Sequence, residues 1–260
     1  NLWTLQPSII PMMFERKQPI QWLRKINGAI VNSNFTEGNA AIKKVKKNST
    51  ISLLFDQSFN TVAYPTLVVS GGKDAEIKIT YAEALFDKNG NKGNRSVIDG
   101  KDILGNYDVF VADGSKERTF RPLWFRTYRY LQLDITVKDD PIEINDFYGM
   151  ATGYPFEVKA SFTSDDASMK DIWDIGWRTA QACAGETYFD CPYYEQLQYE
   201  GDTRIQSLIS LYVTGDDRLM RKAISDFYHS RVPEGLTQGR YPSSRLQVIP
   251  PFSLFWVSMI

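Results

Sequence analysis

The sequence has little of the side-chain chemistry that many enzymes rely on. Of its 260 residues only two are cysteine and one is histidine. Cys183 and Cys191 cannot build a disulfide framework, so we expect two thiols, with a single local bridge as the alternative. One histidine, His229, excludes a histidine-rich zinc site. We expect it at the end of a helix, where the helix dipole favours a cation.

A strong charge and long apolar runs are also lacking. Lys and Arg total 30 and Asp and Glu total 31, a net charge of -1, which argues against nucleic acid as the main partner. No apolar run is long enough to span a membrane, and no signal peptide opens the chain. Phosphate-binding loops, nucleophile elbows and zinc signatures are absent. The chain opens on Asn1 and stops inside an apolar run at Ile260, so we expect both ends to be cut from a longer protein.

What is present is a globular composition, 43% hydrophobic and 23% charged, in a chain long enough for two domains. Short β-branched and aromatic segments recur, with turn residues such as those at 89–94 between them. The predicted strands are 51–55, 66–69, 77–81, 108–111, 128–135 and 142–145, with irregular strands around Trp3, Leu5, Ile9, Ile10 and residues 22–26. This spacing indicates an antiparallel β-sandwich. We expect Arg126 and Arg129 to form an exposed basic row on the surface of this sandwich.

The hydrophobic period changes near Phe162, which marks a predicted domain boundary between residues 1–162 and 163–260. After Ser164-Asp165-Asp166, apolar residues from Met169 to Cys183 recur at three- and four-residue steps, typical of a helix whose two tryptophans, Trp173 and Trp177, lie in a core. Further helices are predicted at 202–214 with Asp202 as N-cap, from Asp217, and from Phe252. The first of these carries an apolar stripe at Ile205, Leu208, Ile209 and Tyr212. The Pro-, Gly- and Ser-rich residues 230–251 form a predicted loop.

One stretch carries most of the potential chemistry: FDCPYYEQLQYEGDTR, residues 189–204. It places Asp190, Glu195 and Asp202 among aromatic residues such as Tyr199. Aromatic rings pack on the apolar faces of sugars, carboxylates bind hydroxyls, and one acid can supply a proton. The stretch therefore predicts a sugar site.

The order of these residues resembles the signature of bacterial α-L-rhamnosidases: Asp190-Cys191-Pro192, then Glu195, the aromatic Tyr199 and Gly201-Asp202. The resemblance is sharp over residues 190–204 and looser over 119–260. It implies an antiparallel β-sandwich followed by the first helices of an (α/α)6 barrel, with inversion at the anomeric carbon of the sugar. It also implies no cofactor and a periplasmic or secreted bacterial protein.

By the same resemblance, Glu195 is the general acid that protonates the leaving oxygen. Asp190 and Asp202 bind rhamnose hydroxyls, and Tyr199 packs on the apolar side of the sugar. An inverting enzyme needs a second carboxylate to activate water. The resemblance implies that this base comes from a later helical hairpin beyond Ile260. We therefore expect the rest of the parent chain to complete the barrel, and the isolated chain to be inactive.

Two other functions remain open at this stage. The chain could belong to another (α/α)6 glycosidase that acts on a different sugar, or it could be a non-catalytic carbohydrate-binding sandwich with a helical appendage. A catalytic Glu on a later hairpin of the parent protein would favour an enzyme.

Overall fold

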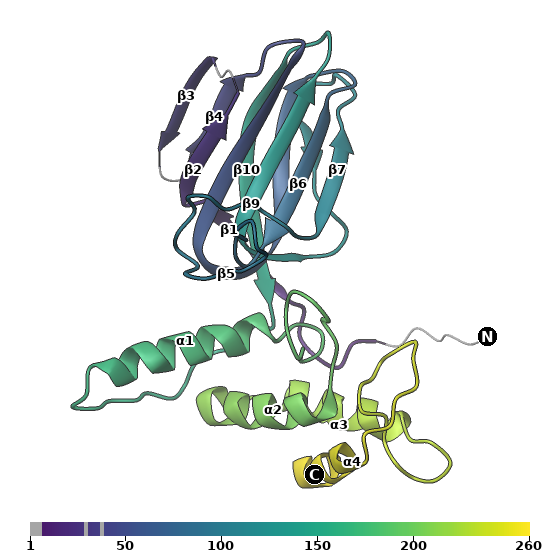
Figure 1. Ribbon diagram of the computed structural model, residues 1–260. Coiled ribbons are helices and arrows are strands. Elements are labelled where there is room, and N and C mark those ends of the chain that lie inside the picture. Colours follow the sequence, from purple (N-terminus) through teal and green to yellow (C-terminus); the bar gives the residue numbers. More distant parts are fainter. Residues whose placement is uncertain (1–6, 29–30, 37–38) are drawn as a thin grey trace. The chain divides into compact units, whose positions relative to one another are not determined.

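The computed structural model describes residues 7–28, 31–36 and 39–260 (Figure 1). The chain folds as two compact units. One is Glu15–Thr152, which holds the strands. The other combines the segment ending at Phe14 with Gly153–Ile260 and holds the helices. The predicted boundary at residue 162 falls in an irregular segment between the last strand and the first helix, and it stays a prediction.

The strand unit is dominated by one eight-stranded sheet, with the order β1-β10-β5-β9-β6-β7 and with β2 and β8 also paired to β5. A separate two-stranded sheet joins β3 to β4. The strands are β1 (Phe14–Pro19), β2 (Trp22–Asn27), β3 (Val31–Thr36), β4 (Asn39–Lys44), β5 (Ser49–Gly71), β6 (Glu76–Ala82), β7 (Tyr107–Val111), β8 (Arg118–Phe120), β9 (Arg126–Val137) and β10 (Ile142–Gly153). The pairings of β5 with β2, β8, β9 and β10 are all antiparallel. The expected antiparallel β-rich part is therefore confirmed.

The strands predicted at 51–55 and 66–69 are one strand, because β5 continues through all 23 of its residues. The pairing of β5 with β9 shifts register between Asp56 and Thr61, where Ser58 has a φ of 71°. A bulge of this kind bends a strand without ending it. β5 then pairs with β10 from Ala63 to Gly71, so one strand contacts different neighbours along its length.

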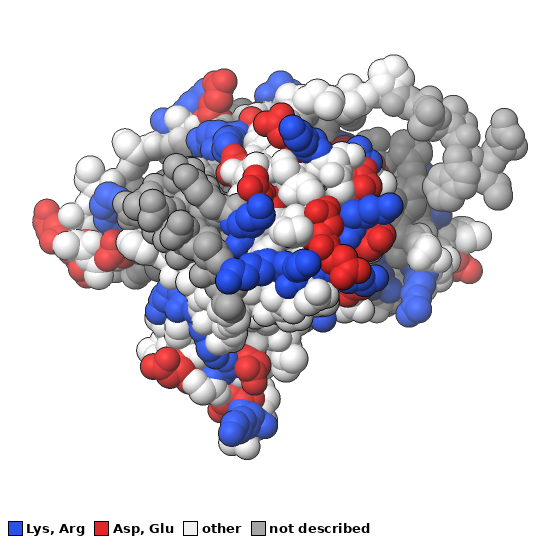
Figure 2. Space-filling view, turned by 90° about the horizontal axis from the view of Figure 1, so that it is seen from above, with Lys and Arg blue, Asp and Glu red and all other residues white. Residues whose placement is uncertain are grey.

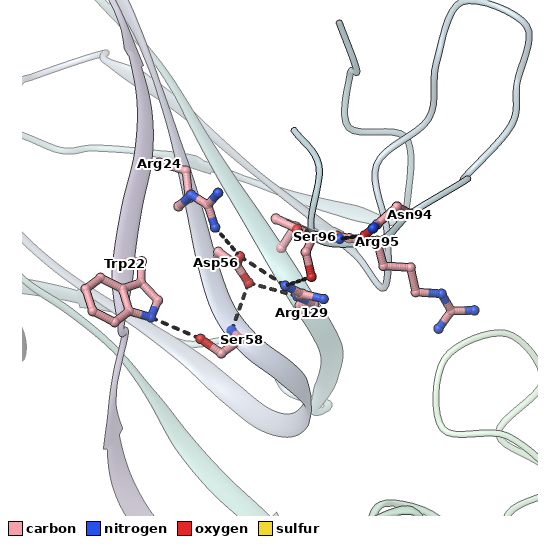
Figure 3. A network of polar contacts seen from close by, with 9 residues as sticks. Trp22, Arg24, Asp56, Ser58, Asn94, Arg95, Ser96 and Arg129 are labelled. Atoms are coloured by element: carbon pink, nitrogen blue, oxygen red, sulfur yellow. Dashed lines mark hydrogen bonds and ion pairs between the residues drawn. The ribbon is translucent and has the colours of Figure 1, made fainter. Parts of the chain in front are cut away.

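The basic row predicted on β9 is wrong. The side chains of Arg126 and Arg129 are only 25% and 16% exposed, because each is paired with an acid, Asp108 and Asp56 respectively. Asp56 is buried and also contacts Arg24 at 2.8 Å, so one carboxylate serves two arginines (Figure 3). These side chains tie β2, β5 and β9 together instead of forming a binding surface.

Charges of both signs are interspersed on the face of the molecule drawn in Figure 2. In the view from above, Lys and Arg lie among Asp and Glu without a broad patch of either sign (Figure 2). None of the helices in the described residues combines the length and the apolarity needed to cross a membrane. Within residues 7–28, 31–36 and 39–260, no three His, Cys, Asp or Glu side chains are grouped so that they could hold a metal ion.

The helical unit contains the four helices that the sequence predicts. They are α1 (Ser168–Ala182), α2 (Glu200–Thr214), α3 (Arg218–His229) and α4 (Pro250–Met259). The Asp166 carboxylate accepts the Ser168 N–H at 2.9 Å at the start of α1. Gly215 ends α2 with a φ of 69°, which glycine adopts without strain. His229 is the last residue of α3, as predicted.

The core of the helical unit gathers residues far apart in the sequence. Its buried members are Ile10, Tyr154, Ala184, Tyr188, Leu219, Ala223, Phe227 and Met259. Ile9 and Ile10 are not in a strand, contrary to the prediction, because Ile10 packs as irregular chain in this cluster. Trp3 and Leu5 lie outside the described residues. No disulfide joins Cys183 and Cys191.

Two helices bury less of their apolar surface than their patterns predict. No residue of α1 is buried. Trp173 stacks on Phe162 and Trp177 packs on Phe156, and both tryptophans are half-buried rather than in a core. In α2 the apolar stripe that includes Ile205 and Tyr212 is exposed. The buried face is instead made of small or polar residues: Glu200, Gly201, Thr203, Ser207, Ser210, Val213 and Thr214.

Candidate active site

The signature segment 189–204 forms a loop that runs into α2. Asp190 and Leu197 are hydrogen-bonded to each other and close the part of the loop that lies between them. The Asp190 N–H donates to the Leu197 carbonyl at 2.9 Å, and Asp190 Oδ1 accepts the Leu197 N–H at 3.1 Å. The Asp190 side chain thus closes the loop that carries Glu195, so two of the three acids are held in one local structure.

Glu195 lies in the closed loop and its side chain is exposed. Its N–H donates to Cys191 Sγ at 3.2 Å, and the next residue, Gln196, has a φ of 54°. The Gln196 N–H and side-chain amide donate to the carbonyls of Cys191 and Pro192 at 3.1 and 2.8 Å. The backbone around Glu195 is therefore fixed while its carboxyl faces solvent, as an acid that meets a substrate requires.

The third carboxylate lies near the first two. Helix α2 begins at Glu200 with Tyr199 as N-cap, so Asp202 is in the first turn and is not the N-cap that the sequence predicts. Burial raises the pKa of Asp202, and the charges of Asp190 and Glu195 raise it further. The Asp190 and Glu195 carboxylates therefore lie near enough to Asp202 to oppose its ionisation.

Tyr199 is half-buried and borders this group of acids. The nearby Glu195 carboxylate, followed by burial, raises the pKa of the Tyr199 hydroxyl. The same hydroxyl accepts a hydrogen bond from Arg240 Nη1 at 2.9 Å. The Arg240 guanidinium also lies 5.5 Å from the centre of the Tyr199 ring.

Arg240 comes from the 230–251 loop, which is fastened to the signature segment through the backbone. Tyr199 and Arg240 form an antiparallel bridge. On either side of it, the Glu200 N–H donates to the Gly239 carbonyl at 3.0 Å and the Tyr241 N–H donates to the Gln198 carbonyl at 3.1 Å. The Gln198 side-chain amide adds a bond to the Tyr241 carbonyl at 2.9 Å. Residues 239–241 thus lie along residues 198–200.

The sequence interpretation assigned no role at the site to Arg240 or Glu200. Arg240 lies 41 residues from Tyr199 in a stretch that reads as solvated loop, so no local pattern connects the two. Glu200 looks like an ordinary first-turn acid, yet it is fully buried and burial raises its pKa to about 7. Its position beside Asp202 and Tyr199 was the one available signal.

Residues 157–260 match the model of a known protein family. They match the bacterial alpha-L-rhamnosidase 6 hairpin glycosidase domain. No curated protein matches the chain. The family match covers all three acids and Tyr199, which confirms the resemblance to bacterial α-L-rhamnosidases.

Solved structures resemble the chain over both units. A GH78 family rhamnosidase of Bacillus sp. GL1 is 21% identical with a TM-score of 0.71, over 86% of this chain and 22% of that one. A rhamnosidase from Klebsiella oxytoca with rhamnose bound is 14% identical with a TM-score of 0.72, over 97% of this chain and 52% of that one. At these identities the likeness shows the fold. The chain spans about a fifth and about half of the lengths of these two rhamnosidases.

Proposed function

We propose that this chain is part of an inverting glycoside hydrolase that removes terminal α-L-rhamnosyl residues from glycans or glycosides. The observation that carries the proposal is the closed loop in which Asp190, hydrogen-bonded to Leu197 through its N–H and its Oδ1, holds an exposed Glu195 shortly before Asp202 in α2. It is supported by the match of residues 157–260 to the rhamnosidase domain. Glycosidic hydrolysis requires an accessible acid that can protonate the leaving oxygen, and Glu195 is exposed.

In this proposal Glu195 is the general acid. It gives its proton to the glycosidic oxygen while the bond between that oxygen and the anomeric carbon breaks, and the oxygen keeps the bonding electrons. A water molecule, deprotonated by a second carboxylate, forms the new bond to the anomeric carbon from the opposite face. The second carboxylate would come from a part of the protein beyond Ile260. No metal or organic cofactor takes part.

The other site residues would hold the sugar. Asp190 and Asp202 would accept hydrogen bonds from rhamnose hydroxyls. The Tyr199 ring would pack on the apolar side of the sugar, where rhamnose carries its methyl group. Asp190 keeps Oδ2 for this task while Oδ1 closes the loop.

The proposed architecture is a β-sandwich over residues 1–162 and the first helices of an (α/α)6 barrel over 163–260. The exposed apolar stripes of α1 and α2 support the barrel, because further helices would cover them. We propose a periplasmic or secreted bacterial location, which rests on the family likeness alone.

The proposal is tested with the full-length protein on a panel of aryl glycosides. We expect hydrolysis of aryl α-L-rhamnosides and little hydrolysis of the corresponding glucosides, galactosides and arabinosides. The anomer released first, followed by proton NMR, should be β-L-rhamnose. A first product with the α configuration would contradict inversion, and preference for another sugar would contradict the substrate.

A further inference from the structure

The Arg240 guanidinium carries N–H donors that no described residue accepts. Nη1 donates to the Tyr199 hydroxyl at 2.9 Å, while Nε is buried without a hydrogen-bond partner. Nη2 also has no hydrogen-bond partner among the described residues, and it is not a buried atom. Since a guanidinium has five N–H donors and no acceptor, Arg240 presents unused donors to solvent.

The 230–251 loop does not need this side chain to stay in place. The loop is fastened through its backbone, where the Glu200 N–H donates to the Gly239 carbonyl at 3.0 Å and the Tyr241 N–H to the Gln198 carbonyl at 3.1 Å. No ion pair among the described residues involves Arg240. A buried N–H without an acceptor, such as Nε, lowers the stability of the fold. The fastening of the loop therefore does not explain an arginine at this position.

The guanidinium lies beside the residues that are proposed to hold the sugar. Tyr199 is its partner both in the backbone bridge and through the phenol hydroxyl. The Tyr199 N–H and the Asp190 N–H donate to the same carbonyl, that of Leu197, at 3.1 and 2.9 Å. Asp202 lies in the first turn of α2, the helix that Tyr199 caps. Arg240 thus borders the segment that carries the acids.

A hydrogen-bond donor complements the acids of this segment. The ionised carboxylates of Asp190 and Asp202 can only accept hydrogen bonds, whereas a sugar hydroxyl both donates and accepts. A hydroxyl that donates to one of these acids keeps lone pairs that need a donor. A guanidinium N–H supplies that donor, and a hydrogen bond from a charged donor is stronger than one between neutral groups.

We propose that Arg240 is a substrate-binding residue that donates a hydrogen bond from Nη2 to a ring hydroxyl of the rhamnosyl group and thereby helps to select this sugar. This inference rests on the proposed function. A sugar without that hydroxyl displaces water from the guanidinium and gives no acceptor in return, so it binds less tightly. The contact breaks no covalent bond and transfers no proton.

The test uses the full-length protein and phenyl α-L-rhamnoside. In Arg240→Met we expect KM to rise about tenfold or more with kcat near wild type, because a charged donor to the sugar is lost. Arg240→Lys keeps a cationic donor and should recover part of the loss. The matched control is Arg245→Met, which removes an exposed arginine of the same loop and should resemble wild type.

Tyr199→Phe separates a contact with the sugar from an effect on the tyrosine. This variant removes the acceptor of Nη1 but keeps the aromatic ring and the Nη2 donor. If Arg240 served only to hold Tyr199, Tyr199→Phe and Arg240→Met would raise KM equally. We expect KM of Tyr199→Phe to stay near wild type, and equal increases in the two variants would overturn the inference.

The three monodeoxy analogues of the substrate, which lack the hydroxyl at carbon 2, 3 or 4, identify the hydroxyl that Arg240 binds. On one analogue Arg240→Met should have little effect, because the partner of Nη2 is already missing, and on the other two its full effect should remain. Arg240→Lys should give the same pattern at smaller size, which decides the question if Arg240→Met does not fold. An equal effect on all three analogues, or none on the parent rhamnoside, would overturn the inference and leave the proposed function intact. If wild type hydrolyses no rhamnoside, both fail.

Discussion

Thr237 Oγ1 donates a hydrogen bond to Glu200 Oε2 at 2.8 Å, across 37 residues of sequence. Thr237 also contacts Ser253 Oγ at 2.8 Å, so the loop, α4 and the first residue of α2 meet at this carboxyl. The other oxygen, Glu200 Oε1, is buried without a hydrogen-bond partner. Burial raises the pKa of Glu200 to about 7 from an ordinary value of 4.5.

This carboxyl should make the helical unit less stable as pH rises. The folded state binds the Glu200 proton more tightly than the unfolded chain does. The protonated carboxyl therefore makes its full contribution to the free energy of unfolding below pH 4.5, and this contribution is lost as pH rises toward about 7. The full loss is about 3 kcal/mol for a shift of this size. Glu200→Gln cannot ionise and should raise the melting temperature more at pH 8 than at pH 5. The exposed Glu186→Gln is the control, and equal gains at both pH values would contradict the assignment.

In the strand unit, Asp56 should contribute more to the free energy of unfolding than a surface acid does. Asp56→Ala leaves Arg24 and Arg129 without their shared partner and leaves the Ser58 N–H without its acceptor. Removing one member of a buried ion pair costs about 3–5 kcal/mol. Amide hydrogen exchange in β5 and β9 should be faster in Asp56→Ala than in the wild type, because the sheet is less stable.

The matched control for this variant is Asp146→Ala. Asp146 pairs with Lys17 at 2.7 Å, but the Lys17 side chain is 57% exposed. Exposed pairs contribute about 0–1 kcal/mol. Similar exchange rates in the two variants would show that the Asp56 network does not stabilise the sheet.

Much of this architecture follows from local patterns. The four helices are recognisable because the apolar residues of each recur at helical spacing within one stretch, and the main strands are β-branched and aromatic. Local patterns failed where a distant partner decides the outcome. Asp56 removes Arg129 from the surface, and a bulge near Ser58 joins two predicted strands into β5. Ile10 is drawn into a core made by Tyr154 and Phe227.

The site residues also divide into those that local sequence patterns predict and those that depend on distant contacts. Asp190, Glu195, Tyr199 and Asp202 could be proposed from the sequence because they lie within 13 residues in a family order. Arg240 could not, since its contact with Tyr199 depends on how the 230–251 loop folds back. The apolar stripe of α2 was recognised correctly as helical, but its exposure depends on neighbours that sequence periodicity does not describe.

Substitution of Tyr199 should weaken rhamnoside binding, because its ring is proposed to hold the sugar and does not itself react. Tyr199→Ala removes the ring and should raise KM for rhamnosides about tenfold or more, since aromatic platforms contribute ~0.5–1.5 kcal/mol beyond their buried area. Tyr199→Phe keeps the ring and should leave KM near wild type. Tyr194→Ala, an exposed ring of the same loop, is the control. An unchanged KM in Tyr199→Ala would make Tyr199 a packing residue.

The 260 residues alone should show no rhamnosidase activity, because the water-activating base is expected elsewhere in the protein. Glu234, an exposed acid of the 230–251 loop, is the candidate within this chain that could replace it. The exposed stripes of α1, α2 and α4, which include Ile172, Tyr212 and Leu254, should also make the isolated chain self-associate. Light scattering and an aryl rhamnoside assay check both points. Robust turnover that is lost in Glu234→Gln would mean that the base lies in this chain.

The central claim, that Glu195 supplies the proton, is tested most directly by Glu195→Gln in the full-length protein. The amide keeps the shape of the side chain but has no acid proton, and general acid catalysis contributes about 10²–10⁴-fold. We predict a loss of this size on phenyl α-L-rhamnoside, a much smaller loss on the activated 2,4-dinitrophenyl α-L-rhamnoside, and unchanged rhamnose binding. Glu186→Gln should resemble wild type on both substrates. Equal, mild losses of Glu195→Gln on the two rhamnosides would contradict the account.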